Sequence, residues 1–205
     1  DISTIEALGN AVDIQWTSSN EEVASVYHGV VTANAIGAAT ITAKAGKSFI
    51  INKETKSQLL SIPSINLVSE SITETALAYF EEKQMPVQLM GVDSVFGQLT
   101  GIENIITDGH YEVFDGAFDR AVLGQGLAWK LGIGVHFIHA IEVYAPKREG
   151  KVNMLRPDVN FNSERCFIAG TFAVNQQKYD ENLMLVDIDL ARRLLDYDTT
   201  EVTAL

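Results

Sequence analysis

Acidic side chains are the most abundant groups in this sequence that could perform chemistry. Two carboxylates held close together can act as general acid and general base, and Asp115 with Asp119 or Asp180 with Asp187 could form such a pair. Short acidic side chains also cap backbone amides at turns and helix starts. We therefore expect caps here, and a carboxylate hydrolase is the alternative. The residues considered are Asp115, Asp119, Asp180, Glu181, Asp187, Asp189, Asp196 and Asp198.

Two histidines form the best candidate for a metal site. His136 and His139 could converge on one ion from a helix, but the apolar run Phe137–Ala145 favours a strand. Side chains three residues apart on a strand point to opposite faces. We therefore expect both histidines to be ordinary, partly buried side chains, and we expect no metal.

The sequence contains no clear nucleophile or phosphate-binding loop. The single cysteine, Cys166, lies in an apolar run and is expected in the core, and a lone cysteine excludes an internal disulfide. The stretch Gly46–Ser48 resembles the end of a phosphate-binding loop, but Ile41 occupies the position of its first glycine. We therefore expect no catalysis and no cofactor. Three aromatic side chains around the Gly124–Gly126 turn are expected in the core rather than in a binding groove: Phe114, Phe118 and Trp129.

The charge balance narrows the classes of partner. Lys and Arg number 15 against 27 Asp and Glu, which gives a net charge of −12 over 205 residues. Such an acidic chain repels nucleic-acid phosphates and anionic lipid headgroups. No run of about 18 apolar residues is present to span a membrane, and the start at Asp1 lacks the regions of a signal peptide. The abrupt start is typical of a mature or excised piece, so anchors could lie on either side.

One polar stretch, Tyr144–Arg165, interrupts this acidic balance. It contains five basic residues against three acidic ones and two of the four prolines of the chain. A long polar loop between two strands is often functional, and a positive patch on an acidic body orients a partner. The alternative is a solvated hairpin. The partner-binding residues that we expect here are Lys147, Arg148, Arg156, Pro157 and Arg165.

The hydrophobic pattern predicts an α+β fold, mainly antiparallel sheet with short helices, because few connections are long enough for parallel crossovers. A composition change near residue 47 predicts a short all-β segment over 1–46 and a second domain over 47–205. Helices are expected at 54–62, 93–103, 125–131 and 188–195, the last being the clearest amphipathic helix. Strands are expected at 23–27, 29–33, 39–43, 65–72, 76–80, 87–92, 121–124, 137–145, 166–174 and 183–186.

Three short strings near the N-terminus share one pattern of strands and turns. They are Trp16–Val26, Gly29–Ala33 and Gly37–Lys44. Together, over residues 15–46, they resemble the second half of a bacterial Ig-like group 2 domain. A complete sandwich of this kind has about twice this length. The resemblance implies a cell-surface binding or adhesion module, which is our alternative function.

A second series of short motifs follows in order through residues 40–205. Their order and spacing resemble the extracytoplasmic core domain of ABC-transporter permeases of the MacB/FtsX type, in particular the lipoprotein-releasing permeases LolC and LolE. The motifs are Gly46–Phe49, Ile62–Glu70, Gly91–Asp93, Ala121–Ala128, Leu131–Ile133, Ala169–Phe172, Met184–Asp187 and Ala191–Tyr197.

This second resemblance implies a non-catalytic periplasmic core domain with two subdomains, at the periplasmic face of the inner membrane. ATP hydrolysis would belong to a separate cytoplasmic subunit. One membrane helix before this region and three after it would connect the domain to that subunit and to a second permease. The projecting loop 144–166 would match the hook that engages a periplasmic carrier or lipoprotein cargo, with Arg165 on its returning arm.

Overall fold

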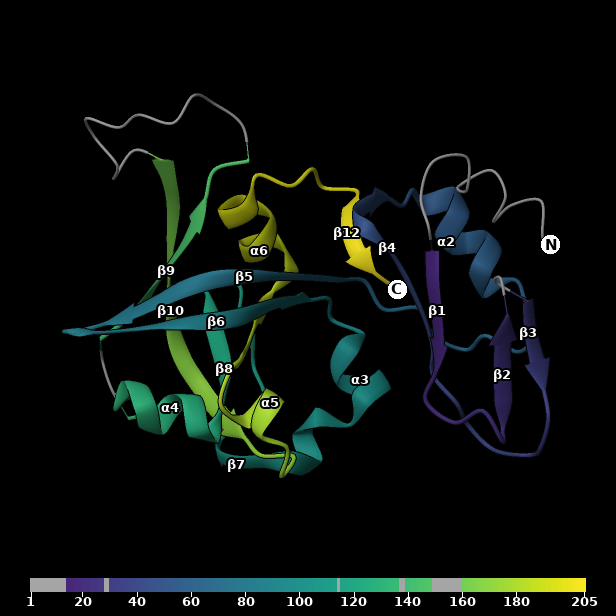
Figure 1. Ribbon diagram of the computed structural model, residues 1–205, viewed down its shortest axis with the longest axis horizontal. Coiled ribbons are helices and arrows are strands. Elements are labelled where there is room, and N and C mark those ends of the chain that lie inside the picture. Colours follow the sequence, from purple (N-terminus) through teal and green to yellow (C-terminus); the bar gives the residue numbers. More distant parts are fainter. Residues whose placement is uncertain (1–13, 28–29, 114, 137–138, 149–159) are drawn as a thin grey trace. The chain divides into compact units, whose positions relative to one another are not determined.

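The computed structural model describes residues 14–27, 30–113, 115–136, 139–148 and 160–205 (Figure 1). The chain forms two compact units, which we call the first unit (residues 1–70 and 200–205) and the second unit (residues 71–199). Short helices and mainly antiparallel strands confirm the expected α+β fold. Among the described residues, no helix is long and apolar enough to cross a membrane.

The described residues of the first unit form a three-stranded antiparallel sheet, a separate hairpin and one helix. The sheet has the order β1-β4-β12, and β2 pairs with β3 in the hairpin. The helix begins where the Asn52 side chain accepts a hydrogen bond of 2.7 Å from the Thr55 amide, which is an N-cap. The elements are β1 (Ile14–Ser18), β2 (Ala24–Tyr27), β3 (Val30–Ala33), β4 (Ile41–Ile50), α2 (Lys53–Leu60) and β12 (Glu201–Ala204).

Part of this unit was predictable from the sequence. Strands β2 and β3 and helix α2 confirm three predictions, and the strand expected at 39–43 is the beginning of β4, which continues past residue 46. The strand expected at 65–72 is wrong up to Glu70, because residues 65–70 have no regular structure. Alternating apolar and polar residues favour an extended backbone, but a strand also needs a partner to pair with. β12 was not predicted, since its partner β4 lies far away in the chain.

Six strands of the second unit close into a ring. The strand β9 pairs with both β10 and β5, which closes the order β5-β6-β11-β8-β10-β9, and β7 pairs with β10. Closure removes the unpaired strand edges that an open sheet exposes. The strands are β5 (Ser71–Phe80), β6 (Lys83–Val92), β7 (Ile106–Gly109), β8 (Arg120–Gly124), β9 (Ile141–Pro146), β10 (Phe161–Phe172) and β11 (Leu183–Asp187).

Side chains at alternate positions of the ring strands point inward and form its core. This follows from the two-residue period of a strand, which sends neighbouring side chains to opposite faces. Most of the inward set is apolar and comes from strands all round the ring, so the interior is a packed core. Its fully buried members include Ala78, Leu89, Leu123, Ile141, Val143, Cys166 and Met184.

Helix α6 (Ile188–Leu195) contacts β5, β6, β9, β10 and β11, so it lies across one end of the ring. The Asp187 carboxylate accepts a 2.8 Å hydrogen bond from the Asp189 amide and caps the helix, as predicted. Gly91 of β6 allows the helix to approach closely, because a Cβ at this position would lie 2.4 Å from the Ala191 Cβ. Figure 1 shows α6 above the β5–β6 hairpin.

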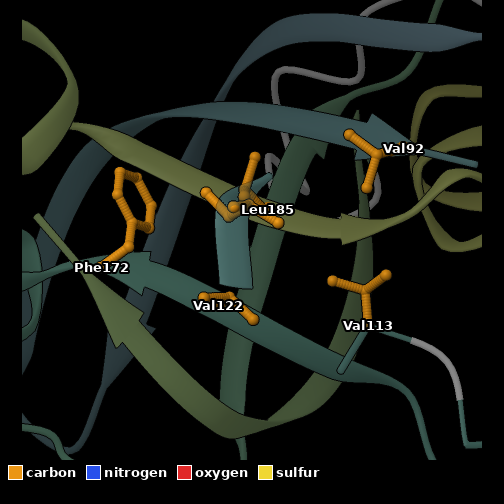
Figure 2. Close-up of a cluster of buried hydrophobic side chains, with 6 residues drawn as sticks. Val92, Val113, Val122, Phe172 and Leu185 are labelled. Carbon is orange, nitrogen blue, oxygen red and sulfur yellow. The ribbon is translucent and has the colours of Figure 1, made fainter. Parts of the chain in front are cut away.

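The outer wall of the ring is covered by apolar groups over part of its circumference. Helix α3 (Phe96–Thr100) and the 3₁₀ helix η1 (Ile102–Ile105) lie against a cluster of outward-pointing strand residues. Figure 2 shows these side chains, which come from β6, β8, β10 and β11, facing the segment that carries Val113. The cluster is Val92, Val122, Phe172 and Leu185 with Ile102 and Val113.

Several boundaries in the second unit differ from the sequence expectations. The helix expected at 93–103 is divided into α3 and η1 by Gly101, whose φ of 63° no regular helix adopts. Residues 93–95 precede α3 as a turn, in which the Asp93 carboxylate accepts the Val95 and Phe96 amides. The strand expected at 137–145 begins only at Ile141, and residues 137–138 lie outside the described residues. The strand expected at 166–174 begins earlier, at Phe161. The strand β7 and the short helix α5 (Gln177–Asp180) were not predicted, whereas β8, β11, α4 (Gln125–Leu131) and α6 confirm their predictions.

The contact between β6 and α6 gives the first testable prediction. Gly91→Ala should lower the free energy of unfolding by about 1–3 kcal/mol, because the new methyl group overlaps the Ala191 side chain. Ala191→Gly costs about 1 kcal/mol of helix propensity by itself. In the double variant the overlap is relieved, so the combined loss in urea unfolding should fall at least ~0.5 kcal/mol short of the sum. Strictly additive losses would contradict the contact.

Candidate functional site

Three of the five expected partner-binding residues, Lys147, Arg148 and Arg165, lie on or beside the ribbon formed by β9 and β10. The two strands are antiparallel and lie side by side, from Phe161 opposite Pro146 to Cys166 opposite Ile141 (Figure 1). The Lys147 amide donates a 2.9 Å hydrogen bond to the Asn160 carbonyl, which extends the ladder beyond β9. The ribbon is therefore a rigid platform for the side chains at its surface.

Arg165 is held on the outer wall of the ring by its neighbour across the strands. It stands opposite Glu142 and forms an ion pair with it through Nη2, yet 74% of its side chain remains exposed. The Tyr144 hydroxyl donates a 2.6 Å hydrogen bond to the same carboxylate. Glu142 thus orients Arg165, and most of the Arg165 side chain remains exposed to solvent.

The electrostatics of this group follow from these two contacts. The hydrogen bond from Tyr144 is the largest influence that lowers the pKa of Glu142 below its ordinary value, and the neighbouring Arg165 lowers it further. The pKa of the Tyr144 phenol is raised, because its hydroxyl proton is held by the Glu142 carboxylate. Both shifts keep Glu142 ionised and Tyr144 protonated at neutral pH, which maintains the ion pair.

Arg148 has a different environment at the far end of β9. Its guanidinium carbon lies 4.2 Å from the centre of the Tyr197 ring, which is a cation–π geometry. Its Nη1 points at the Asp196 carbonyl oxygen at 3.5 Å, next to the C-terminus of α6. A cation at this end of a helix also interacts favourably with the helix dipole. Arg148 therefore anchors the end of the ribbon to α6, while the neighbouring Lys147 is exposed.

The expected basic residues that the structure describes, Lys147, Arg148 and Arg165, do not form a single cluster. Arg148 is six positions along the ribbon from Glu142, the partner of Arg165, which corresponds to about 20 Å at 3.3 Å per residue. Arg156 and Pro157 lie outside the described residues. Of the five expected partner-binding residues, Arg165 is the one described cation that combines high exposure with a fixed orientation on the outer wall.

A set of outward-facing apolar and aromatic side chains near Arg165 was not predicted. We call it the bare wall: Leu77 and Tyr79 of β5, Tyr144 of β9 and Phe161 of β10. Leu77, Tyr79 and Phe161 are 36%, 39% and 47% exposed. In β5 the large apolar residues Leu77 and Tyr79 occupy the outward positions, because they alternate with the buried residues Ala76, Ala78 and Phe80. Such apolar residues at both alternating sets of positions could have indicated an apolar outer face. Phe161 gave no such signal, since its segment was expected to be a loop.

The acidic residues act mainly as caps and ion-pair partners, in agreement with the sequence interpretation. Asp115 accepts hydrogen bonds from the Ala117 and Phe118 amides and from Arg120, which lower its pKa to about 2. Asp180 accepts the Val174 and Gln176 amides. Asp187 caps α6, Asp119 pairs with Arg193, Glu181 pairs with Lys130, and Asp198 accepts the Thr199 amide.

The second unit contains an apolar hollow. It measures about 270 Å³ and borders the outer core cluster, with Phe96, Phe172 and Leu185 among its walls. None of the described residues lining it is an aspartate, glutamate or histidine. Among the residues that the structure describes, no three His, Cys, Asp or Glu side chains are grouped to hold a metal ion.

The expectation for the two histidines is wrong in one respect. His136 and His139 are exposed rather than partly buried, because the chain at both positions turns before β9 begins. His139 lies 3.9 Å from a Glu81 carboxylate oxygen. Cys166 is buried as predicted, and burial raises the pKa of its thiol, so it is not a reactive thiolate at neutral pH.

The expectation that Phe118 and Trp129 belong to the core is also wrong. Phe118 is 60% exposed and meets Phe167 edge-on with ring centres 5.8 Å apart, and Trp129 is 73% exposed. Helix α4 buries Leu127, Ala128 and Leu131, so its geometry turns Trp129 away from the core. Phe114 lies outside the described residues.

Comparison with known proteins gives one family match and several similar folds. The model of the bacterial Ig-like domain (group 2) matches residues 2–54. No match was found among curated proteins. The Ig-like match covers the hairpin β2–β3 and β4 but ends before the second unit.

Two solved structures resemble most of this chain. One is the extracellular domain of the noncanonic ABC-type transporter YknZ from Gram-positive bacteria, with a TM-score of 0.53 and 13% identity over 77% of this chain and 71% of that chain. The other is a domain described as that of a permease protein from Porphyromonas gingivalis, with a TM-score of 0.41 and 18% identity over 70% of this chain and 56% of that chain. At this identity the likeness to the YknZ domain is one of fold.

The hydrogen-bonded carboxylate at the centre of this surface can be tested by titration. A carboxyl group with a lowered pKa stabilises the fold fully above its unfolded pKa, and this contribution is lost as the pH falls through the lowered folded pKa. Tyr144→Phe should raise the Glu142 pKa, as observed by carbon-detected NMR, and should raise it more than Arg165→Gln does. A larger effect of Arg165→Gln, or none from Tyr144→Phe, would contradict the assigned causes.

Proposed function

We propose that this chain is an extracytoplasmic domain of an ABC-transporter permease that binds a partner protein and performs no catalysis of its own. The observation that carries the proposal is the fold shared with the YknZ extracellular domain over 77% of this chain. The motif series along residues 40–205, read from the sequence alone, points to the same class of protein. ATP hydrolysis would then belong to a separate cytoplasmic subunit.

The partner-binding part of the proposal is supported by the surface around β9 and β10. The Arg165 guanidinium is exposed and oriented on an otherwise acidic protein, which favours an acidic region of a partner. The loop 144–166 contains the further basic residues Lys147, Arg148 and Arg156. We propose a periplasmic carrier or lipoprotein cargo as this partner, as in lipoprotein-releasing permeases.

The position of the chain in its full gene product tests the transporter assignment. If the proposal is correct, the complete protein has one membrane-spanning helix before this region and three after it. A topology assay with reporter fusions at each side should place this domain outside the cytoplasm. Flanking regions without membrane helices would overturn the assignment.

The partner-binding assignment has its own test. Arg156→Glu combined with Arg165→Glu should abolish the pull-down of the periplasmic lipoprotein carrier, because both charges that attract its acidic region are reversed. The melting temperature should remain nearly unchanged, since the Arg165 side chain is largely exposed. Lys53→Glu with Lys178→Glu is the matched control, because it changes the net charge equally at exposed positions elsewhere. Normal binding by the first pair would remove this loop from the mechanism.

A cell-surface adhesion module is the second candidate function. It is favoured by the match of residues 2–54 to the bacterial Ig-like model and by exposed apolar residues in the first unit, with Tyr27 and Ile36 as the most exposed. This function requires tandem copies of the Ig-like sequence in the full gene product. A single copy next to membrane helices would exclude it.

A further inference from the structure

The outer wall of the ring in the second unit has an apolar cover over one part and none over another. Along β6, β11, β8 and the end of β10, the wall is covered by α3, η1 and the Val113 segment. Over β5, β9 and the start of β10, the described residues provide no such cover, and the bare wall is exposed. A contiguous apolar surface of this kind commonly marks a protein-binding site.

We propose that the bare wall binds an amphipathic helix of a partner protein, with a carboxylate of that helix paired to Arg165. The inference rests on the proposed function, because it assumes a partner-binding domain, and it specifies what the partner must present. The apolar stripe of the helix would cover Leu77, Tyr79, Tyr144 and Phe161. The carboxylate would take the guanidinium donors that Glu142 leaves open.

The register makes the four apolar residues one continuous surface. Leu77 of β5 stands opposite Tyr144 of β9, and Tyr79 stands opposite Glu142. Phe161 of β10 stands opposite Pro146, two positions along β9 from Tyr144 on the same face. Directly paired residues have Cβ atoms about 5 Å apart, which is side-chain contact distance. The apolar side chains therefore lie beside the Glu142–Arg165 pair. Tyr79 is opposite Glu142, and Ser163 stands between Phe161 and Arg165 on β10.

The dimensions of the bare wall match a short helix better than a second copy of this chain. Three strands spaced about 4.8 Å apart, over about five residues of 3.3 Å, give a surface of roughly 200–300 Å². A stable dimer buries about 800 Å² on each partner. A helix about 10 Å wide and three turns long covers the bare wall. Two copies that each carry a charge of −12 would also repel one another.

The fold itself supplies a precedent for this mode of packing on β10. Helix α6 places a buried apolar face on the ring and fixes its position with Arg193, which pairs with Glu164 of β10 and with Asp119. Adjacent residues of a strand point to opposite faces. Glu164 therefore places a negative charge on the inner side of β10, and Arg165 places a positive charge on the outer wall. The same arrangement there requires a helix that carries an acidic residue.

Two matched helical peptides test the proposal. Each has about 16 residues with the same leucine stripe, flanked at identical positions by glutamate in one and by lysine in the other. Binding to the 205-residue chain is measured by fluorescence anisotropy, and the site is located from NMR shifts. We expect the glutamate peptide to bind at least ~10-fold more tightly than the lysine peptide and to shift the signals of Leu77, Tyr144 and Phe161.

Variants of the bare wall provide the decisive comparisons. Arg165→Glu should reverse the preference between the peptides, and Leu77→Ser should weaken both by at least ~10-fold without changing the far-ultraviolet circular dichroism. Lys178→Glu, an exposed cation of α5, should change neither affinity.

Three outcomes would overturn the proposal. They are equal binding of both peptides, binding located elsewhere by NMR, and self-association through the bare wall in sedimentation. If the carrier is not pulled down but the peptides bind as expected, the partner proposed for the loop is wrong and the helix site stands. The two tests are separable, because Leu77→Ser leaves the loop residues Lys147 and Arg156 unchanged. Failure of the peptide assay alone would contradict only the helix.

Discussion

The close contact between Gly91 of β6 and Ala191 of α6 is the constraint on which the second unit depends. It lets the helix settle across one end of the six-stranded ring, and the helix then fixes the ribbon β9–β10 through several independent contacts. Asn162 donates a 3.0 Å hydrogen bond to the Leu194 carbonyl, Glu164 pairs with Arg193, and Arg148 lies over Tyr197. The surface residues proposed to bind a partner therefore stand on a platform held from its inner side. A larger residue at position 91 would move the helix and with it the platform.

The two faces of the ring strands differ in burial. Inward residues such as Val143 and Cys166 fill the ring, while outward residues next to them in sequence either meet a local helix or remain exposed. Burying apolar area contributes about 25 cal/mol per Å², so covering a wall of a few hundred Å² contributes several kcal/mol of gross binding free energy. Only part of this free energy appears as affinity, because association also costs entropy. The Glu142–Arg165 pair beside the bare wall would add orientation and a preference for an acidic partner, because Glu142 is itself held by Tyr144.

The sequence predicted those parts of the structure that depend on local signals. Helix α6 begins after the N-cap Asp187, and helix α4 ends at Gly132, which adopts the left-handed conformation. Such caps are visible in the sequence itself, and both helices were predicted correctly. The failures have a common origin in long-range geometry. The segment 65–70 alternates like a strand but has no regular structure, and β12 depends on a distant partner. Trp129 is large and apolar but faces solvent, because α4 turns its Leu127, Ala128 and Leu131 face to the core. The bare wall was missed for the same reason, since the charge count located Arg165 but only the strand register brings Leu77 and Phe161 beside it.

The central claim is that the bare wall is a partner-binding surface in the assembled protein. The buried Cys166 is protected from alkylation, so a single added cysteine at Leu77 can be followed without removing the native one. The measurement is the alkylation rate of Leu77→Cys in the isolated 205-residue chain and in the full-length protein in its native membrane. The account predicts rapid alkylation in the isolated chain and strong protection in the membrane, while Lys178→Cys reacts equally in both. Equal alkylation of Leu77→Cys in the two settings would contradict the claim.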